Sequence, residues 1–173
     1  MPANVSEPSC WFAARTRYGQ ELKIKSLLTD MGVEHFIPTH EVIKISAGHK
    51  RKVTKPLISN LIFVRSTKAN AFALVNYRGL PFKYIIDRQT HTLLLVPEKQ
   101  MDDFIRVVSS PFGETGALEE NLEVGDNVRV VWGDLAGVEG RVAQVQNKTY
   151  IVVDLCGLLQ AKAVVPQAWL VKS

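Results

Sequence analysis

Cysteine is scarce in this sequence, with only Cys10 and Cys156 among 173 residues. The two cysteines form no CxxC pair and have no Cys/His ligand spacing, so they give neither a disulfide framework nor a structural zinc site. The four histidines are scattered without the i, i+4 spacing of a zinc-binding helix. We therefore expect two reduced, buried cysteines, no metal and no other cofactor.

Long apolar runs and an N-terminal export signal are also missing. Apolar stretches such as Leu93 to Val96 are far too short to cross a bilayer, and the N-terminus has no basic region followed by an apolar one. We therefore expect a cytoplasmic protein that does not contact a membrane. The hydrophobic content of 46% and the charged content of 22% are typical of a soluble globular chain.

Recognisable catalytic motifs are absent as well. Asp102 and Asp103 are adjacent carboxylates, but neighbours on a helix diverge by about 100° and cannot easily share one substrate, so a solvated helix face is the simpler interpretation. No Gly-Lys-Ser/Thr follows the glycines at 133–140, and no Ser/His/Asp set stands in a known motif. The chain is therefore not expected to be an enzyme.

Positive charge is concentrated in the first part of the chain. Residues 1–110 hold 16 Lys and Arg against 9 Asp and Glu, a net charge of +7, whereas residues 111–173 hold 5 against 8, a net charge of −3. A basic domain favours an anionic partner, either nucleic acid or an acidic protein surface, although a basic face kept for solubility gives the same count.

The first 108 residues predict alternating strands and helices. Apolar or β-rich runs predict strands at 10–14, 33–45, 56–65, 80–87 and 92–96. Apolar spacing and capping residues predict helices at 19–32, 68–76 and 97–108. The middle helix should turn Phe72 and Val75 inward, and the polar, basic stretch 46–55 should be an exposed hairpin tip or loop. This order predicts an α/β sandwich, in which helices pack against a mostly antiparallel sheet.

The chain after residue 121 predicts a small β-barrel. Within GDNVRVVWGDLAGVEGRV, residues 125–142, the apolar side chains of Val128, Val130 and Trp132 recur at every second position, as in a strand with one buried face. Glycines then follow where the chain must reverse. A tight turn is expected at Asn147-Lys148, and residues 169–171 would close the barrel.

Between these two patterns, residues 109–121 combine serine, proline, glycine and glutamate without periodicity, which predicts a flexible linker. The predicted organisation is an α+β protein with an α/β sandwich at 10–108, the linker at 109–121 and a barrel at 122–173. A second domain this small, without a disulfide, favours a compact five-stranded barrel. We expect the protein to be a monomer.

The glycine-punctuated strands resemble the KOW motif of the NusG family of transcription elongation factors, although glycine-rich turns occur in any SH3-like barrel. The first domain resembles the NGN domain of the same family. The matching features are Trp11, Gly19, Glu21, Pro38, Pro56-Leu57, Phe63-Val64, Arg78-Gly79-Leu80 and Val96-Pro97. The resemblance spans residues 10–172 and implies an NGN sandwich followed by a KOW barrel, with no enzymatic role.

The central strand departs from general NusG proteins, which have Pro-Gly-Tyr-Val-Phe where this chain has SNLIF at 59–63. The asparagine is more similar to the specialised paralogues UpxY and RfaH, which act on selected long operons. UpxY is the nearer of the two, through the segments NLIFV, PFKYIID and VPEKQM. This similarity implies antitermination and processive elongation of long operons such as surface polysaccharide loci.

The resemblance also implies that the first domain binds the clamp helices of RNA polymerase through an apolar depression. The matching positions are Leu57, Ile58, Leu61 and Phe63. By strand alternation Leu57 and Leu61 share a face with Phe63, whereas Ile58 lies on the other face. Half of the set would therefore fill the core, and Phe63 is the first candidate for that role.

Basic residues are expected to contact the non-template DNA strand, nascent RNA or an acidic polymerase surface. They are Arg15, Arg17, Lys50, Arg51, Lys52 and Arg78. Phosphate contacts of this kind give salt-dependent affinity with little sequence preference. The family motif places Arg17 and Arg78 beside the binding face, whereas residues 50–52 could equally be a solvated hairpin.

In the second domain, the loop with Gly133, Leu135 and Gly137 corresponds to the family's partner-binding loop, and leucine stands where an aromatic residue is common. Family members use this barrel to reach a small-subunit ribosomal protein or the termination factor Rho. RfaH refolds it into a helical hairpin. Here the β-branched runs at 128–131 and 150–153 favour a stable barrel, so no such switch is expected.

Two further functions stay open at this point. One is a general NusG elongation factor, and the other is an RNA- or ribosome-binding KOW protein. Sheet-based RNA recognition normally uses exposed aromatic side chains, and only 8% of the residues are aromatic. Direct RNA binding in the absence of polymerase would favour the second of these.

Overall fold

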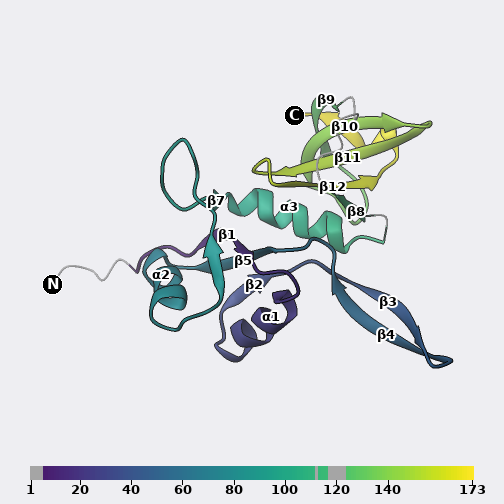
Figure 1. The fold of residues 1–173 in the computed structure, drawn as a ribbon. Helices are drawn as coiled ribbons and strands as arrows, with labels where there is room; N and C mark the ends of the chain where they lie inside the picture. Colours follow the sequence, from purple (N-terminus) through teal and green to yellow (C-terminus); the bar gives the residue numbers. More distant parts are fainter. Residues whose placement is uncertain (1–5, 112, 117–123) are drawn as a thin grey trace. The chain divides into compact units, whose positions relative to one another are not determined.

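The computed structural model describes residues 6–111, 113–116 and 124–173. The chain forms two compact units, Met1–Val96 and Pro97–Ser173. Both contain antiparallel sheets and helices, which confirms the predicted α+β class (Figure 1). Within the described residues, no helix is long and apolar enough to span a membrane.

The first unit is built on a five-stranded sheet in which β2, β5, β1 and β6 lie side by side and β7 also pairs with β1. All these pairings are antiparallel. The strands are β1 (Cys10–Thr16), β2 (Glu34–Phe36), β5 (Leu61–Ser66), β6 (Phe82–Tyr84) and β7 (Leu95–Val96). Strand β1 is central because its apolar run, Trp11 to Ala14, is buried on both faces.

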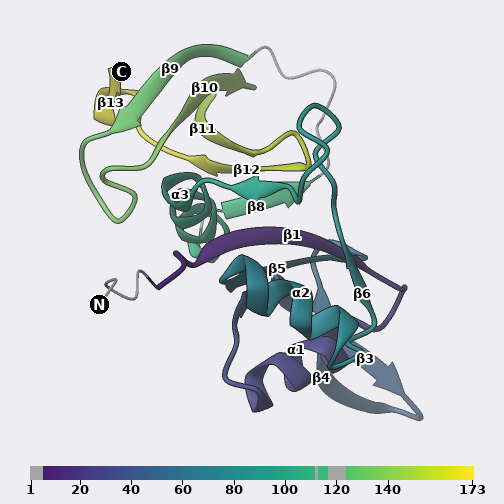
Figure 2. The same cartoon turned by 90° about the vertical axis from the view of Figure 1, so that its left-hand side faces the viewer.

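Two helices, α1 (Glu21–Asp30) and α2 (Lys68–Asn76), pack on one face of this sheet (Figure 2). Ile24 and Leu28 of α1 and Leu74 of α2 join Ile62 and Val64 of β5 in one apolar cluster. Helix α2 covers the predicted residues and begins at a Thr67 cap, whose hydroxyl accepts a hydrogen bond from the Asn70 amide at 3.2 Å. The expectation that Phe72 turns inward was wrong, because its side chain is 57% exposed.

A separate two-stranded sheet, β3 (Thr39–Ser46) with β4 (His49–Pro56), extends from the five-stranded sheet in both views (Figures 1 and 2). Ala47 and Gly48 make the turn, with φ angles of 50° and 79°. The basic stretch expected as a hairpin tip or loop is therefore mostly regular strand, and only its first residues form the tip.

The second unit combines α3 (Glu98–Ser109) with a six-stranded antiparallel sheet. The sheet order is β13, β9, β10, β11, β12 and β8. These strands are β8 (Gly113–Gly116), β9 (Val124–Val130), β10 (Glu139–Val145), β11 (Lys148–Leu155), β12 (Leu159–Val164) and β13 (Leu170–Lys172). Strands β9 to β13 correspond to the expected five-stranded barrel, and β8 adds a sixth strand.

The second unit differs from the sequence expectation in several places. Residues 113–116 lie within the predicted linker, yet they form a strand that pairs with β12. The last part of that linker, 117–121, and the first two residues of the predicted barrel, 122–123, lie outside the described residues. The predicted domain boundary after residue 108 stays a prediction, while the contacts group α3 with the barrel. Trp132 was expected on the buried face but is 67% exposed. The turn after β10 has positive φ at Gln146 and Asn147, the two central residues of a tight hairpin.

Candidate functional site

Three loops meet at one end of the five-stranded sheet. Thr16, the last residue of β1, pairs with Phe82 at the start of β6, and Arg15 pairs with Leu61 at the start of β5. The chain leaving β1 at 17–20 therefore lies beside the loops at 57–60 and 77–81 that enter β5 and β6. We call this region the loop end.

A buried carboxylate fixes the 57–60 loop. Glu21 opens helix α1 and is only 2% exposed, and its Oε1 accepts a hydrogen bond from the Asn60 amide at 2.7 Å. Asn60 adopts a φ of 68°, a left-handed conformation that asparagine tolerates better than most residues. Its carbonyl accepts from the Thr16 amide at 3.0 Å, so the loop is bonded to both neighbouring elements.

The four residues expected in the apolar contact divide into two pairs. Leu57 is 38% exposed and Ile58 is half-buried, both in the loop that Glu21 anchors. Leu61 and Phe63 are only 3% and 0% exposed, and they alternate with Ile62 and Val64, so they face away from the cluster formed with α1 and α2. Leu61 and Phe63 could reach a partner only if their face of the sheet became uncovered.

The structure brings three of the expected basic residues together at the loop end. Arg15 lies near the end of β1, Arg17 directly follows that strand, and Arg78 precedes β6; all three are exposed. Gly79 has a φ of 64°, which lets the chain turn directly from Arg78 to the buried Leu80. Arg17 and Arg78 thus lie on neighbouring loops although they are 61 positions apart in the sequence.

Exposed aromatic residues accompany these arginines, and the sequence analysis did not identify them. Tyr18 and Tyr77 are each 82% exposed, and the ring of Phe72 meets that of Tyr77 edge-to-face with centroids 6.4 Å apart. The sequence signal that could have identified these tyrosines is that each lies next to an arginine, in the dipeptides Arg17-Tyr18 and Tyr77-Arg78. Aromatic faces beside guanidinium groups suit a single nucleic-acid strand, since bases stack on the rings while the cations meet phosphates.

The remaining basic residues lie apart from the loop end. Lys50, Arg51 and Lys52 are exposed on β4, near the tip of the β3–β4 ribbon. The base of the ribbon adjoins the loop end, where the Leu57 amide donates to the Pro38 carbonyl at 2.8 Å. With about 3.3 Å per strand residue, the tip stands roughly 25 Å from that base. These three residues therefore form a second basic site.

In the second unit, helix α3 holds the expected partner loop. Arg106 Nη2 donates to the carbonyls of Asp134 and Ala136, both at 2.8 Å, and Lys99 Nζ donates to the carbonyl of Gly137 at 2.8 Å. Leu135 is only 8% exposed, so the leucine expected to meet a partner faces inward.

Glycine is required at position 133 of this loop. Gly133 has a φ of 79°, and a Cβ there would lie 2.5 Å from the Trp169 ring. Leu135, Val165, Pro166 and Trp169 line a mainly apolar cavity of about 430 Å³ next to the loop. The loop is therefore packed on one side and bonded to α3 through its carbonyl groups.

Asp103 of α3 also departs from expectation. It was interpreted as part of a solvated helix face, yet it is 3% exposed. Its Oδ2 accepts from Lys99 Nζ at 2.5 Å and from the Glu139 amide at 3.1 Å. This carboxylate is therefore a structural anchor between α3 and β10, while the adjacent Asp102 is exposed as expected.

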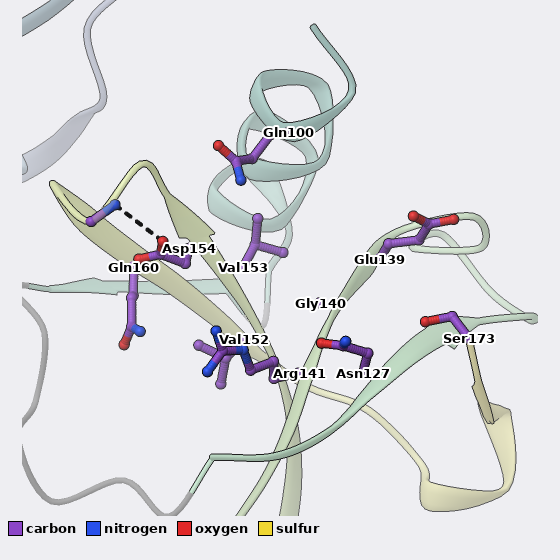
Figure 3. Close-up of a pocket in the computed structure, with 11 residues that line it drawn as sticks. Gln100, Asn127, Glu139, Gly140, Arg141, Val152, Val153, Asp154, Gln160 and Ser173 are labelled. Carbon is purple, nitrogen blue, oxygen red and sulfur yellow. Dashed lines mark hydrogen bonds between the residues drawn. The ribbon is translucent and has the colours of Figure 1, made fainter. Parts of the chain in front are cut away.

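A larger cavity of about 570 Å³, lined by both polar and apolar residues, lies in the second unit (Figure 3). Its polar lining residues include Gln100, Asn127, Glu139, Arg141, Asp154 and Gln160. Asp154 Oδ2 accepts a hydrogen bond from the Gly157 amide at 3.1 Å, drawn dashed in the close-up. In the parts of the chain that the structure describes, no three His, Cys, Asp or Glu side chains gather into a metal site.

A family model described as the transcription termination factor NusG matches residues 9–105. The chain belongs to the NusG family. This is a family of non-enzymatic transcription factors, and membership implies RNA polymerase binding. The matched residues include the whole loop end and most of α3. Asn60, within the matched residues, has a φ of 68°, a conformation that glycine adopts without strain and that asparagine tolerates.

Proposed function

We propose that this NusG-family protein is a specialised elongation factor that binds RNA polymerase and promotes antitermination on selected long operons, such as surface polysaccharide loci. The observation that carries this proposal is the loop end. There an exposed apolar loop, two loops with arginines and two exposed tyrosines lie side by side. The similarity of residues 59–63 to the UpxY and RfaH type supports the specialised role.

In this proposal Leu57 and Ile58 make the first apolar contact with the polymerase clamp helices. They lie in a loop that is fixed by Glu21, so the contact surface is ordered before binding. Leu61 and Phe63 contribute only where their side of the sheet becomes accessible. Holding the clamp closed around DNA then suppresses pausing.

Arg15, Arg17 and Arg78 contact phosphates of the non-template strand, and the rings of Tyr18 and Tyr77 stack on its bases. Such contacts tolerate many sequences, since every base has a π-face. A transient single strand beside the polymerase is therefore the substrate that this geometry suits best.

The barrel is proposed to reach a small-subunit ribosomal protein or Rho through the loop at Gly133, Leu135 and Gly137. Because Leu135 is buried and α3 occupies three loop carbonyl groups, the exposed contacts come from neighbouring side chains such as Trp132. Continuous antiparallel pairing from β9 to β12 supports a barrel that does not refold into helices.

Binding of the full chain to its cognate core RNA polymerase tests the proposal. We expect co-elution for the wild type and a loss of at least about tenfold in affinity for Leu57→Glu, since a charge is placed in an apolar contact. Ile86→Glu is the matched control, because Ile86 is 51% exposed in the same unit and follows β6, outside the three loops of the loop end. Equal binding by Leu57→Glu and wild type would remove Leu57 from the contact.

The exposed tyrosines also favour a second function, direct RNA binding by the first unit. RNA recognition depends on aromatic side chains that can stack on unpaired bases. Binding of a single-stranded RNA without polymerase, together with no binding to polymerase, would support this function in place of the first.

A further inference from the structure

The ribbon formed by β3 and β4 carries no buried side chain on either strand. Only Thr39, Val42, Val53 and Pro56 are half-buried, and every other residue of the two strands is exposed. Five exposed cations lie along it: Lys44, Lys50, Arg51, Lys52 and Lys55. We call residues 39–56 the basic ribbon.

The strand register distributes these cations over both faces. Residues directly opposite each other in an antiparallel pair share a face. Lys44 lies opposite Arg51 on one face. On the other face, Ile43 lies opposite Lys52 and Ile45 lies opposite Lys50. The two isoleucines are 65% and 69% exposed, so this second face presents apolar surface flanked by two ammonium groups.

The pairing of Lys44 with Arg51 is unfavourable for the isolated protein. Like charges directly opposite each other destabilise a strand pair. Among the described residues, Glu41 forms an ion pair with one of these cations, Lys52, at 3.2 Å. Both side chains are well exposed, so the pair contributes little. Lysines that only protect strand edges from aggregation would not require two cations to face each other. The arrangement is therefore best explained by an anionic partner.

We propose that the basic ribbon enters a groove of double-stranded DNA and contacts the phosphates of both walls. A two-stranded ribbon fits the major groove, which is about 12 Å wide. The turn at Ala47 and Gly48 has only two residues, so the tip is no wider than the ribbon. Ile43 and Ile45 then lie against sugars or thymine methyl groups. Because the cations read phosphates, binding carries little sequence preference.

The distribution over two faces is what selects duplex DNA as the partner. A single strand or an acidic protein surface would meet one face of the ribbon and leave the other in solvent. A groove instead has a phosphate wall on each side. The basic ribbon is a site distinct from the loop end. Its biological role rests on the proposed function, because a factor that travels with RNA polymerase lies close to duplex DNA.

Fluorescence anisotropy of the full-length protein with a labelled random-sequence duplex, over a salt series and without polymerase, tests the inference. One variant, Lys44→Gln with Arg51→Gln, removes the facing pair from the first face and leaves Lys55, which lies opposite His40 on the same face. A second, Lys50→Gln with Lys52→Gln, neutralises the other. The control, Lys23→Gln with Lys68→Gln, removes the same charge from exposed positions on α1 and α2. Melting temperatures check folding, and the Lys44/Arg51 variant should melt no lower than wild type, because a repulsive pair is removed.

Each face variant should lower the slope of log affinity against log salt by about 1.8, and the combined variant by about 3.6. Affinity should fall by at least about tenfold in the combined variant, with little change in the control. Dependence on one face only, an equal loss of single-strand and duplex affinity in the combined variant, or unchanged duplex binding in all variants would each overturn the proposal. Since no polymerase is present, failure here is distinguishable from failure of the proposed function.

Discussion

Glu21 and Asn60 lie 39 positions apart in the sequence, yet a 2.7 Å hydrogen bond joins the Glu21 carboxylate to the Asn60 amide. The carboxylate is 2% exposed, so this bond is shielded from water. It connects the start of α1 to the loop that carries Leu57. The stability of the fold and the order of the proposed polymerase contact therefore depend on the same interaction.

Replacing Glu21 with alanine should reduce the free energy of unfolding by about 2 to 3 kcal/mol, because the part-buried Asn60 amide loses a charged acceptor. Glu21→Gln keeps an acceptor and should cost less. Urea denaturation measures both effects. Glu34→Ala is the control: its carboxylate forms a 3.0 Å ion pair with Arg65 at a more exposed site and should cost less than about 1 kcal/mol. A similar loss for Glu34→Ala and Glu21→Ala would contradict the special role of Glu21.

Asn60→Gly should be close to neutral, whereas Asn60→Val should cost about 1 to 3 kcal/mol. The φ of 68° suits glycine and is strained for a β-branched residue. In addition, Asn60 Oδ1 is buried with no hydrogen-bond partner among the described groups, so glycine removes an unsatisfied atom. Thermal melting of the two variants gives the comparison, and equal destabilisation by glycine and valine would show that backbone conformation is not the cause.

Removal of the rings at the loop end should weaken single-strand binding. Tyr18→Ala and Tyr77→Ala should each lower affinity for an oligo-dT strand by roughly 1 to 3 kcal/mol, the usual contribution of one stacked base. The phenylalanine variants at both positions retain the ring and should bind nearly as well as wild type. Anisotropy titrations measure these affinities. Alanine variants that bind like wild type would exclude stacking at this site.

Stability should fall at alkaline pH through Tyr84. Burial raises the pKa of the Tyr84 hydroxyl above its ordinary value of about 10. The folded state thus holds this proton more tightly than the unfolded state, so the stabilisation is complete below about pH 10 and is lost as the pH rises further.

Tyr84→Phe removes this titration and should flatten the alkaline decline in the free energy of unfolding. At neutral pH the variant should be nearly as stable as wild type, since the Tyr84 hydroxyl is buried without a partner among the described groups. Urea denaturation at pH 8 and above pH 10 would compare the two proteins. An identical alkaline decline in Tyr84→Phe would assign the pH dependence to other groups.

Local sequence patterns predicted most helices and strands of this fold, because the periodicity of a helix or a strand depends on residues that are close together in the sequence. Helix α2 was predicted at its observed bounds, and the tight turn expected at Asn147-Lys148 lies one position earlier, at Gln146 and Asn147. Trp132 does not continue the alternation of buried and exposed side chains, because β9 ends at Val130 and the chain turns at Gly133. Residues 113–116 have weak strand character and pair only because β12 offers an edge.

The site depended on long-range pairing, which the sequence did not reveal. The loops that carry Tyr18 and Tyr77 become neighbours through the register of β1 with β6, in which Thr16 pairs with Phe82. The buried carboxylate of Asp103 accepts a hydrogen bond from the Glu139 amide, which is 36 positions away in the sequence. Alternation could place Leu61 and Phe63 on one face, but it could not say whether that face was covered.

Single-round transcription by the cognate RNA polymerase, through a pause site and a terminator, tests the central claim most directly. The full-length protein should shorten the pause and increase read-through, and Leu57→Glu should lose most of both effects while Ile86→Glu keeps them. Unchanged pausing and termination in the presence of a folded wild-type protein that binds polymerase would contradict the proposed role in elongation.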